Sequence, residues 1–173
     1  MKIFNSKLHI LLFIVFFAVT VLIAAKIFKF SSEPATVSKK TSNSFIYKTA
    51  ELFNGNFSEI SVEDREVIVE KYSTIVRKLA HFSIYASLGF FAFLSARCIK
   101  KPDSNKLKVL SVGLFTLLYS VSDEIHQLFV AGRSCGAVDV IIDFSGSLFG
   151  IAAALLVALI VSHKILHIER NTY

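Results

Sequence analysis

Cysteine is scarce in this chain, and several familiar motifs are missing from it. The two cysteines, Cys98 and Cys135, form neither a CxxC pair nor a thiol metal-ligand pattern, which excludes a cysteine zinc site. A net charge of +6 could indicate a nucleic-acid-binding protein, but the basic residues form no patch interleaved with aromatic residues. We therefore expect free thiols and no nucleic-acid partner.

Polar residues are too few for a soluble domain of this length. Hydrophobic residues make up 54% of the 173 positions, with 17 phenylalanines and no tryptophan. A soluble domain of this size could not hide so much apolar surface from water, whereas lipid accepts it. The basic residues flank apolar runs, which is typical of membrane topology. The composition therefore predicts one integral membrane domain.

Four long apolar runs, at residues 8–25, 79–99, 107–130 and 138–162, predict four transmembrane helices. Each run is long enough, as a helix, to cross a hydrocarbon core of about 30 Å. The first run also resembles a signal peptide, but its length and the lack of an A-x-A site favour an uncleaved helix. The predicted fold class is all-α: an integral membrane bundle of four transmembrane helices, with a short amphipathic helix in the outer loop.

The loop between the second and third runs is strongly basic and has only Asp103 as an acid, so we expect it in the cytoplasm. With four spans, the N-terminus and C-terminus also fall on the cytoplasmic side. The short loop at 131–137 then lies outside, and Cys98 and Cys135 lie at opposite membrane faces.

We divide the chain into an N-terminal transmembrane helix at 1–30, an extracytoplasmic linker with amphipathic helices at 31–76, and a three-helix membrane region at 77–173. The polar stretch at 31–44 predicts a mobile linker. Ile46, Ala50 and Phe53 then recur at helical spacing, which indicates a short amphipathic helix on the outer leaflet or a flap over the bundle.

A further helix is expected to begin after Ser61, which suits an N-cap and is followed by two acids. Val62, Val69 and Val76 share a stripe of this helix. The stripe predicts that the helix leads directly into the second membrane span.

Ionisable residues of three runs are predicted to meet near the outer surface. Charged groups within membrane helices cost about 2.5–3.5 kcal/mol each on insertion scales, so they usually face the bundle interior and pair. Such a cluster favours a shared polar pocket over ion pairs that merely fix helix register. The candidate ligand-binding residues are Arg77, Lys78, His81, Tyr85, Asp123, Glu124, Gln127, Arg133, Asp139 and Asp143.

Gly146 and Gly150 form a GxxxG pair that follows Asp143 on the fourth run. Small residues at this spacing let two helix backbones approach closely, so we expect a tight helix crossing here. That crossing would bring Asp143 near a neighbouring helix.

Three segments resemble the VanZ-like family, which is named after a teicoplanin-resistance protein. They are RKLAHFSIYASLGF at 77–90, SDEIHQLFVAGRS at 122–134 and DVIIDFSGSLFG at 139–150, and they lie in the last hundred residues. Family members often have Asn where Asp143 stands, and commonly Pro where Ala131 stands. The matching positions are Lys78, His81 and Tyr85; Asp123, Glu124, Gln127, Gly132 and Arg133; and Asp139, Asp143, Gly146 and Gly150.

The resemblance implies a multi-pass protein of a bacterial plasma membrane that lowers susceptibility to teicoplanin. The first functional hypothesis is a pocket that binds a membrane lipid headgroup, a lipid-linked cell-wall precursor or a lipoglycopeptide, with arginine holding phosphate or carboxylate. The alternative is an intramembrane enzyme whose catalytic candidates are His81, Glu124 and Asp143. Transport ranks last, because no internal repeat is visible.

A metal site is not predicted from the sequence. His81, His126, Glu124 and an aspartate include ligand types suited to a divalent ion, but no HExxH or similar spacing connects them. No Ser, Cys or Thr stands in a nucleophile motif either. We therefore expect no metal and no cofactor, while the oligomeric state stays open.

Overall fold

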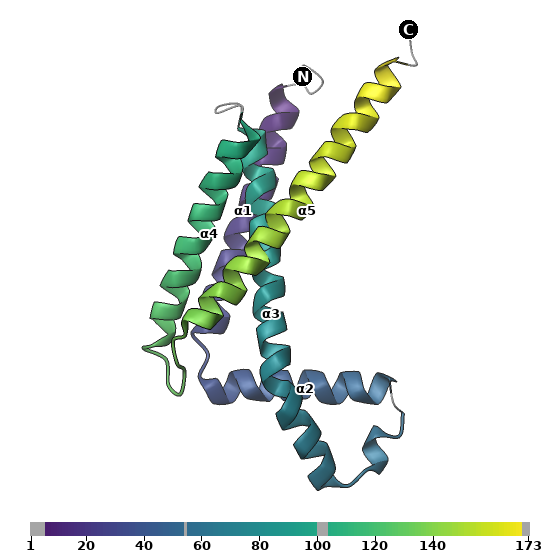
Figure 1. The fold of residues 1–173 in the computed structure, drawn as a ribbon, viewed down its shortest axis with the longest axis vertical. Helices are drawn as coiled ribbons and strands as arrows, with labels where there is room; N and C mark the ends of the chain where they lie inside the picture. The colour runs from purple at the N-terminus through teal and green to yellow at the C-terminus, as the bar shows by residue number, and fades with distance from the viewer. Residues whose placement is uncertain (1–5, 54, 100–103, 171–173) are drawn as a thin grey trace.

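The computed structural model describes residues 6–53, 55–99 and 104–170, and every regular element in these ranges is helical. The long helices are α1 (Ser6–Ser31), α3 (Val62–Cys98), α4 (Asn105–Gln127) and α5 (Ala137–Arg170). They run along the long axis of the molecule, while α2 (Ala35–Phe53) lies across one end of the bundle (Figure 1). A short 3-10 turn, η1 (Phe57–Glu59), connects α2 to α3.

Three of the helices are long and apolar enough to cross a membrane: α1, α3 and α5. The prediction of four spans is therefore not confirmed as a count. α4 is not among these candidate spans. Its 23 residues include two lysines near its start and Asp123 and Glu124 near its end, and these lower its mean hydropathy. The coarser expectation of an all-α membrane protein with several spans holds.

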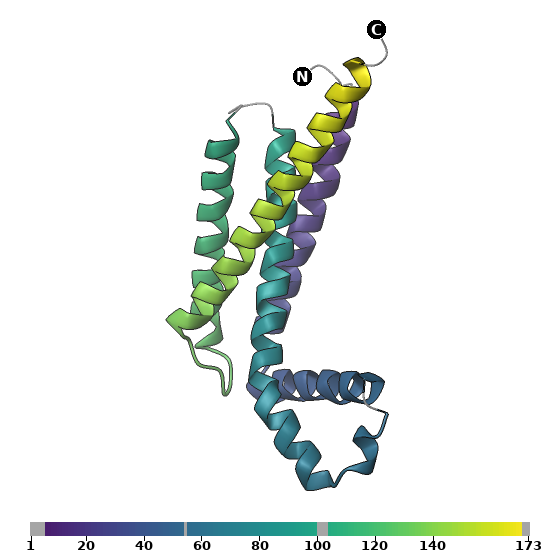
Figure 2. The same cartoon turned by 45° about the vertical axis from the view of Figure 1, so that its right-hand side comes forward.

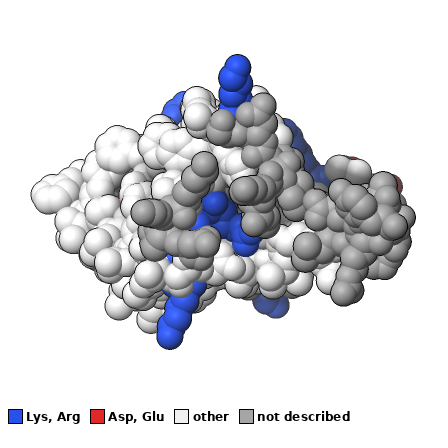
Figure 3. Space-filling view, turned by 90° about the horizontal axis from the view of Figure 1, so that it is seen from above, with Lys and Arg blue, Asp and Glu red and all other residues white. Residues whose placement is uncertain are grey.

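The start of α1 and the end of α5 lie at the same end of the bundle, opposite to α2, in both side views (Figures 1 and 2). Lysine and arginine account for nearly all the charged surface in view at this end (Figure 3). Cys98 closes α3 here, whereas Cys135 lies in the loop between α4 and α5 at the other end, and both are free. We call these the basic end and the α2 end.

The crossing of α3 and α5 is the tightest in the bundle. A Cβ added to Gly146 or Gly150 would overlap the backbone of Phe82 or Ala86 on α3, and one added to Gly89 would overlap that of Ser147 on α5. The close approach that the GxxxG pair predicts is therefore present.

The polar stretch at 31–44 is not the linker that the sequence predicts, because most of it belongs to α2. Packing against α3 explains the difference: Ser42 and Ile46 are buried there, and Lys39 pairs with Glu70 of α3 at 2.7 Å. Tertiary contacts thus override a weak local preference. Of the apolar stripe predicted for α2, Ile46 is buried, whereas Phe53 is 89% exposed.

The start of α3 agrees with the prediction. The hydroxyl of Ser61 accepts a hydrogen bond from the Asp64 N–H at 3.1 Å, which satisfies one of the free donors at the helix start. The helix continues without a break to Cys98. Val69 is buried against Ile46 and Phe57, but Val62 of the predicted stripe is exposed.

Candidate functional site

A polar cavity of about 90 Å³ opens at the α2 end of the bundle, between α3, α5 and the loop that joins α4 to α5. Eight of the ten predicted ligand-binding residues line it. Tyr85 and Asp123 are the exceptions, and both are buried next to it. The lining residues are Arg77, Lys78, His81, Glu124, Gln127, Gly132, Arg133, Ser134, Asp139, Ile142 and Asp143.

One side of the cavity is a pair formed between α3 and α5. The imidazole Nδ1 of His81 lies 3.5 Å from a carboxylate oxygen of Asp143. The tight glycine crossing one turn further along α5 sets this distance, because it holds the two backbones together. Asp143 is only 1% exposed, and neither of its oxygens accepts a hydrogen bond from the described residues.

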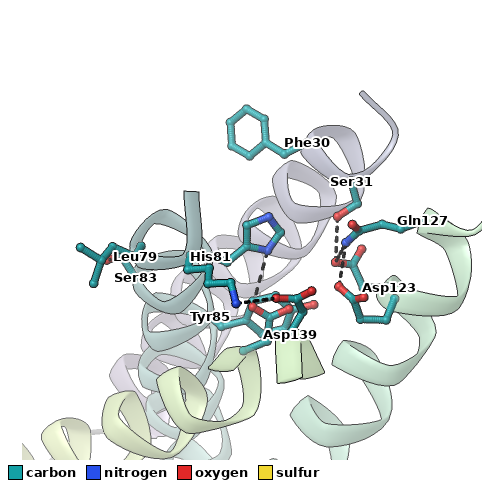
Figure 4. A network of polar contacts seen from close by, with 12 residues as sticks. Phe30, Ser31, Leu79, His81, Ser83, Tyr85, Asp123, Gln127 and Asp139 are labelled. Atoms are coloured by element: carbon teal, nitrogen blue, oxygen red, sulfur yellow. Dashed lines mark hydrogen bonds and ion pairs between the residues drawn. The ribbon is translucent and has the colours of Figure 1, made fainter. Parts of the chain in front are cut away.

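The opposite side is built from the last turn of α4. Asp123 accepts a hydrogen bond from the hydroxyl of Ser31 at 2.7 Å, so the end of α1 supports this carboxylate (Figure 4). Glu124 accepts from the Gly136 N–H at 3.1 Å and from the Gln127 amide at 3.0 Å. Glu124 therefore fastens the start of α5 to the end of α4.

Arg133 closes the cavity by joining two distant segments. Its guanidinium donates to the carbonyl oxygens of Phe30 at 3.0 Å and Glu33 at 3.1 Å, and a backbone bond from Ala35 to Ala131 runs beside it. Burial lowers the pKa of Arg133, and the nearby Arg77 guanidinium lowers that pKa further. Gly132 precedes it with a φ of 73°, a left-handed conformation that other residues rarely adopt.

The remaining cations differ in how firmly they are held. Lys78 and Asp139 form an ion pair of 3.7 Å with side chains 40% and 41% exposed, so this pair contributes little to stability. Arg77 makes no hydrogen bond or ion pair with any residue that the structure describes, although two cavities share it. It is therefore the cation that is most available to a ligand.

A second, more apolar cavity of about 170 Å³ adjoins the first. It lies between α1, α2 and α3 and shares Arg77, His81 and Arg133 with the polar cavity. Ile27, Phe30, Ala80 and Ile84 contribute its apolar surface. A polar compartment thus opens beside an apolar one.

Three contributors to this site were not predicted from the sequence. Ser31 and Ser147 are fully buried and donate to Asp123 and to the Tyr85 carbonyl, and the Gly136 N–H binds Glu124. A single serine belongs to no recognisable motif, and Ser31 lies at the start of the stretch that was expected to be a linker, so neither serine could be identified from the sequence. His126, in contrast, does not line the cavity: it stacks on Phe28 with ring centroids 4.6 Å apart and contacts Ser32.

The sequence model of the family described as VanZ/LLP1 matches residues 15–159. This match begins in α1 and includes α2, and so extends well beyond the last hundred residues in which the resemblance was found. No curated protein and no solved structure matches the chain.

Proposed function

The chain belongs to the VanZ/LLP1 family, and on this premise we propose that its cavity binds the anionic headgroup of an amphiphile at the outer face of a bacterial plasma membrane. Such a molecule is a lipid-linked cell-wall precursor or a lipoglycopeptide, and binding it would lower susceptibility to teicoplanin. The observation that carries the proposal is Arg77, which is unpaired among the residues that the structure describes and stands where a polar and an apolar cavity meet.

The two compartments match the two parts of an amphiphile. Arg77, Lys78 and Arg133 offer donors to a phosphate or carboxylate, and arginine favours such groups through its planar fork. The apolar compartment accepts the first part of a hydrocarbon tail. A cavity of about 90 Å³ has room for a headgroup such as phosphate, whereas a whole glycopeptide would extend beyond it.

Arg77 is a better test residue than Arg133. Removal of Arg133 also breaks two hydrogen bonds that fasten the loop, so a loss of binding would be ambiguous. We expect Arg77→Gln to weaken binding of dioleoyl phosphatidate in nanodiscs about tenfold or more, since a charge-assisted hydrogen bond contributes about 1.5–3 kcal/mol. Arg97→Gln, at the basic end of the same helix, is the matched control.

Three ligands identify the source of the headgroup chemistry. Phosphatidate tests a lipid phosphate, inorganic phosphate tests the free anion, and teicoplanin tests the antibiotic. Equal affinity of wild type and Arg77→Gln for phosphatidate would refute headgroup binding at this cavity. Binding of teicoplanin alone would identify the antibiotic as the ligand.

We also propose that α4 is a fourth span and, because short cytoplasmic loops are enriched in lysine and arginine, that the basic end lies in the cytoplasm. Its 23 residues cover about 35 Å at about 1.5 Å per residue, enough for a hydrocarbon core. The polar residues that lower its hydropathy, such as Thr116, Ser120 and Asp123, are buried in the bundle. Its outward residues are apolar: Leu110, Leu114, Leu118 and Ile125 are each more than half exposed.

The native cysteines test this topology. If α4 crosses the membrane, Cys135 faces outside and Cys98 faces the cytoplasm. A membrane-impermeant maleimide should then label intact cells through Cys135, and Cys135→Ser should abolish that labelling. Cys98 should react only after permeabilisation. Labelling of both thiols in intact cells would exclude α4 as a span.

An intramembrane enzyme is the second candidate function, and the buried pair of His81 and Asp143 favours it. An imidazole held 3.5 Å from a carboxylate and facing a cavity is arranged as a general base is. Glu124 is less suited, because its oxygens are already engaged by Gly136 and Gln127. Incubation with lipid-linked precursor and mass spectrometry of the lipid fraction would detect a product, which His81→Asn should abolish.

A further inference from the structure

Three ionisable side chains from three different helices meet beside the cavity. His81 comes from α3, Asp123 from α4 and Asp143 from α5, and one ligand atom from each lies within 4.8 Å of the other two. No local motif connects residues that are 42 and 20 positions apart, which is why sequence spacing gave no indication of a metal site.

The carboxylate of Asp143 points to a missing ligand. It is 1% exposed, and its only polar contact among the described residues is the 3.5 Å approach of His81, with no hydrogen bond to either oxygen. The hydroxyl of Tyr85, at 0% exposed, also makes no hydrogen bond within 3.5 Å among these residues, and the group nearest to offering one is the Asp123 carboxylate. Buried polar groups nearly always have partners, because leaving them without one is costly.

Charge counting indicates what is missing. Asp123 and Asp143 bring two negative charges into a buried space. Among the described residues, the only cationic group within 4.0 Å of either carboxylate is His81, and when protonated it neutralises only one of them. Ser31 and Gln127 donate neutral hydrogen bonds to Asp123, so they add no charge. A divalent cation bound by both carboxylates and a neutral imidazole would balance the site.

We propose that His81, Asp123 and Asp143 bind a divalent cation of the zinc or manganese class. One imidazole nitrogen and two carboxylates suit such ions, and three protein ligands leave a coordination position open to an outside group. Ligand atoms about 2.1 Å from a tetrahedral ion are about 3.4 Å apart, close to the 3.5 Å between His81 and Asp143. An oxygen of Asp123 lies within 4.8 Å of both other ligand atoms and would move closer to complete the set.

The cation would also change the charge of the cavity. Arg77, Lys78 and Arg133 are offset by Glu124, Asp139 and Asp143, so the lining alone has little net positive charge. A bound dication beside His81 makes the same space attractive to a phosphate, whose oxygen would take the open position. This consequence rests on the proposed headgroup binding, whereas the metal site itself does not.

The experiment is equilibrium dialysis of the full-length protein in detergent against Zn²⁺, and separately Mn²⁺, after treatment with EDTA and removal of any affinity tag. We expect about one tightly bound ion per chain and at least a tenfold loss of affinity in Asp143→Asn and in His81→Asn. Asp64→Asn and His126→Asn are the matched controls, because they remove the same groups at positions outside both the three-residue cluster and the cavity lining.

Thermal unfolding separates loss of the site from loss of the fold. Metal should raise the unfolding temperature of the wild type and both controls, and should leave that of Asp143→Asn and His81→Asn unchanged. A wild type that binds neither ion, or cluster variants that bind as well as the controls, would overturn the proposal. Headgroup binding is measured separately with phosphatidate and EDTA, so its failure leaves the metal result standing.

Discussion

The two halves of the bundle differ in the side chains that α3, α4 and α5 enclose. Towards the basic end, α3, α4 and α5 enclose an apolar core formed by Ala92, Phe93, Val112, Ile151 and Ala154. Towards the α2 end, they enclose Tyr85, Asp123, Glu124, Gln127 and Asp143. In lipid, apolar side chains gain little from leaving their surroundings, so shape and close packing hold the first half together, whereas polar matching holds the second.

The difference is the reason for placing the proposed function in the polar half. In the apolar half, the buried Lys108 donates to the Ile99 carbonyl at 2.9 Å, so this buried cation is satisfied. In the polar half, Asp143 and Tyr85 keep buried polar atoms without hydrogen-bond partners among the described residues. A membrane protein that retains such groups bears a stability cost, which is typical of a site for a ligand.

The largest effect is expected where the two halves meet. Gly150→Leu places a large side chain against the Ala86 backbone, which cannot move aside, so α3 and α5 cannot cross as they do. We expect a loss of at least about 3 kcal/mol and aggregation in size-exclusion chromatography. Gly113→Ala is the control, since its Cβ meets nothing within 4 Å, and it should be neutral or slightly stabilising. A well-folded Gly150→Leu would show that the crossing is not essential.

Phe93→Ala tests the apolar half alone. Its ring is fully buried, and its removal leaves a cavity in the core. We expect the free energy of unfolding to fall by about 3 kcal/mol, measured by circular dichroism in a denaturing detergent titration. Phosphatidate affinity measured well below the unfolding midpoint should not change. A matching loss of affinity would mean that the two halves are not independent.

Arg133→Ala tests the closure of the polar half. Two hydrogen bonds to the Phe30 and Glu33 carbonyls are lost, and the free energy of unfolding should fall by about 2 kcal/mol. The loop should also open more often, so the Gly136 amide, which donates to Glu124, should exchange its hydrogen faster than in the wild type. Arg97→Ala serves as the control for loss of charge, and unchanged exchange of this amide in Arg133→Ala would argue against a fastening role.

Tyr85→Phe is expected to have the smallest effect, and in the opposite direction. It removes a buried hydroxyl that has no hydrogen-bond partner in the described part of the chain. The variant should be as stable as the wild type or up to about 1 kcal/mol more stable in the same titration. A clear loss of stability would reveal a partner for the hydroxyl, such as the proposed ion or a bound water.

Much of the fold could be predicted because local rules govern it. The apolar runs predicted helices in the right places, Ser61 predicted the start of α3, and the two glycines predicted its crossing with α5. The polar stretch at 31–44 misled, because α2 is held by contacts with α3 that lie some thirty residues away. Similarly, whether α4 can cross a membrane depends on which of its polar residues face inward, and mean hydropathy does not report that.

The candidate site could be predicted only as a list of residues. Depth along each helix placed the ionisable groups at the same level, and most of them line one cavity. Their roles required the structure: Glu124 and Arg133 fasten loops, Arg77 stands unpaired among the described residues, and His126 faces Phe28. Pairings between helices depend on their rotation, and spacing within one helix does not determine that.

The continuity of α3 has a mechanical consequence. This helix of 37 residues, about 55 Å long at about 1.5 Å per residue, packs against α2 in its first half, lines the cavity through Arg77, Lys78 and His81, and ends at the basic end. The glycine crossing with α5 lies between its two ends. A force on α2 would therefore tilt α3 about its crossing with α5. A displacement at the α2 end would reach the basic end as this tilt of α3.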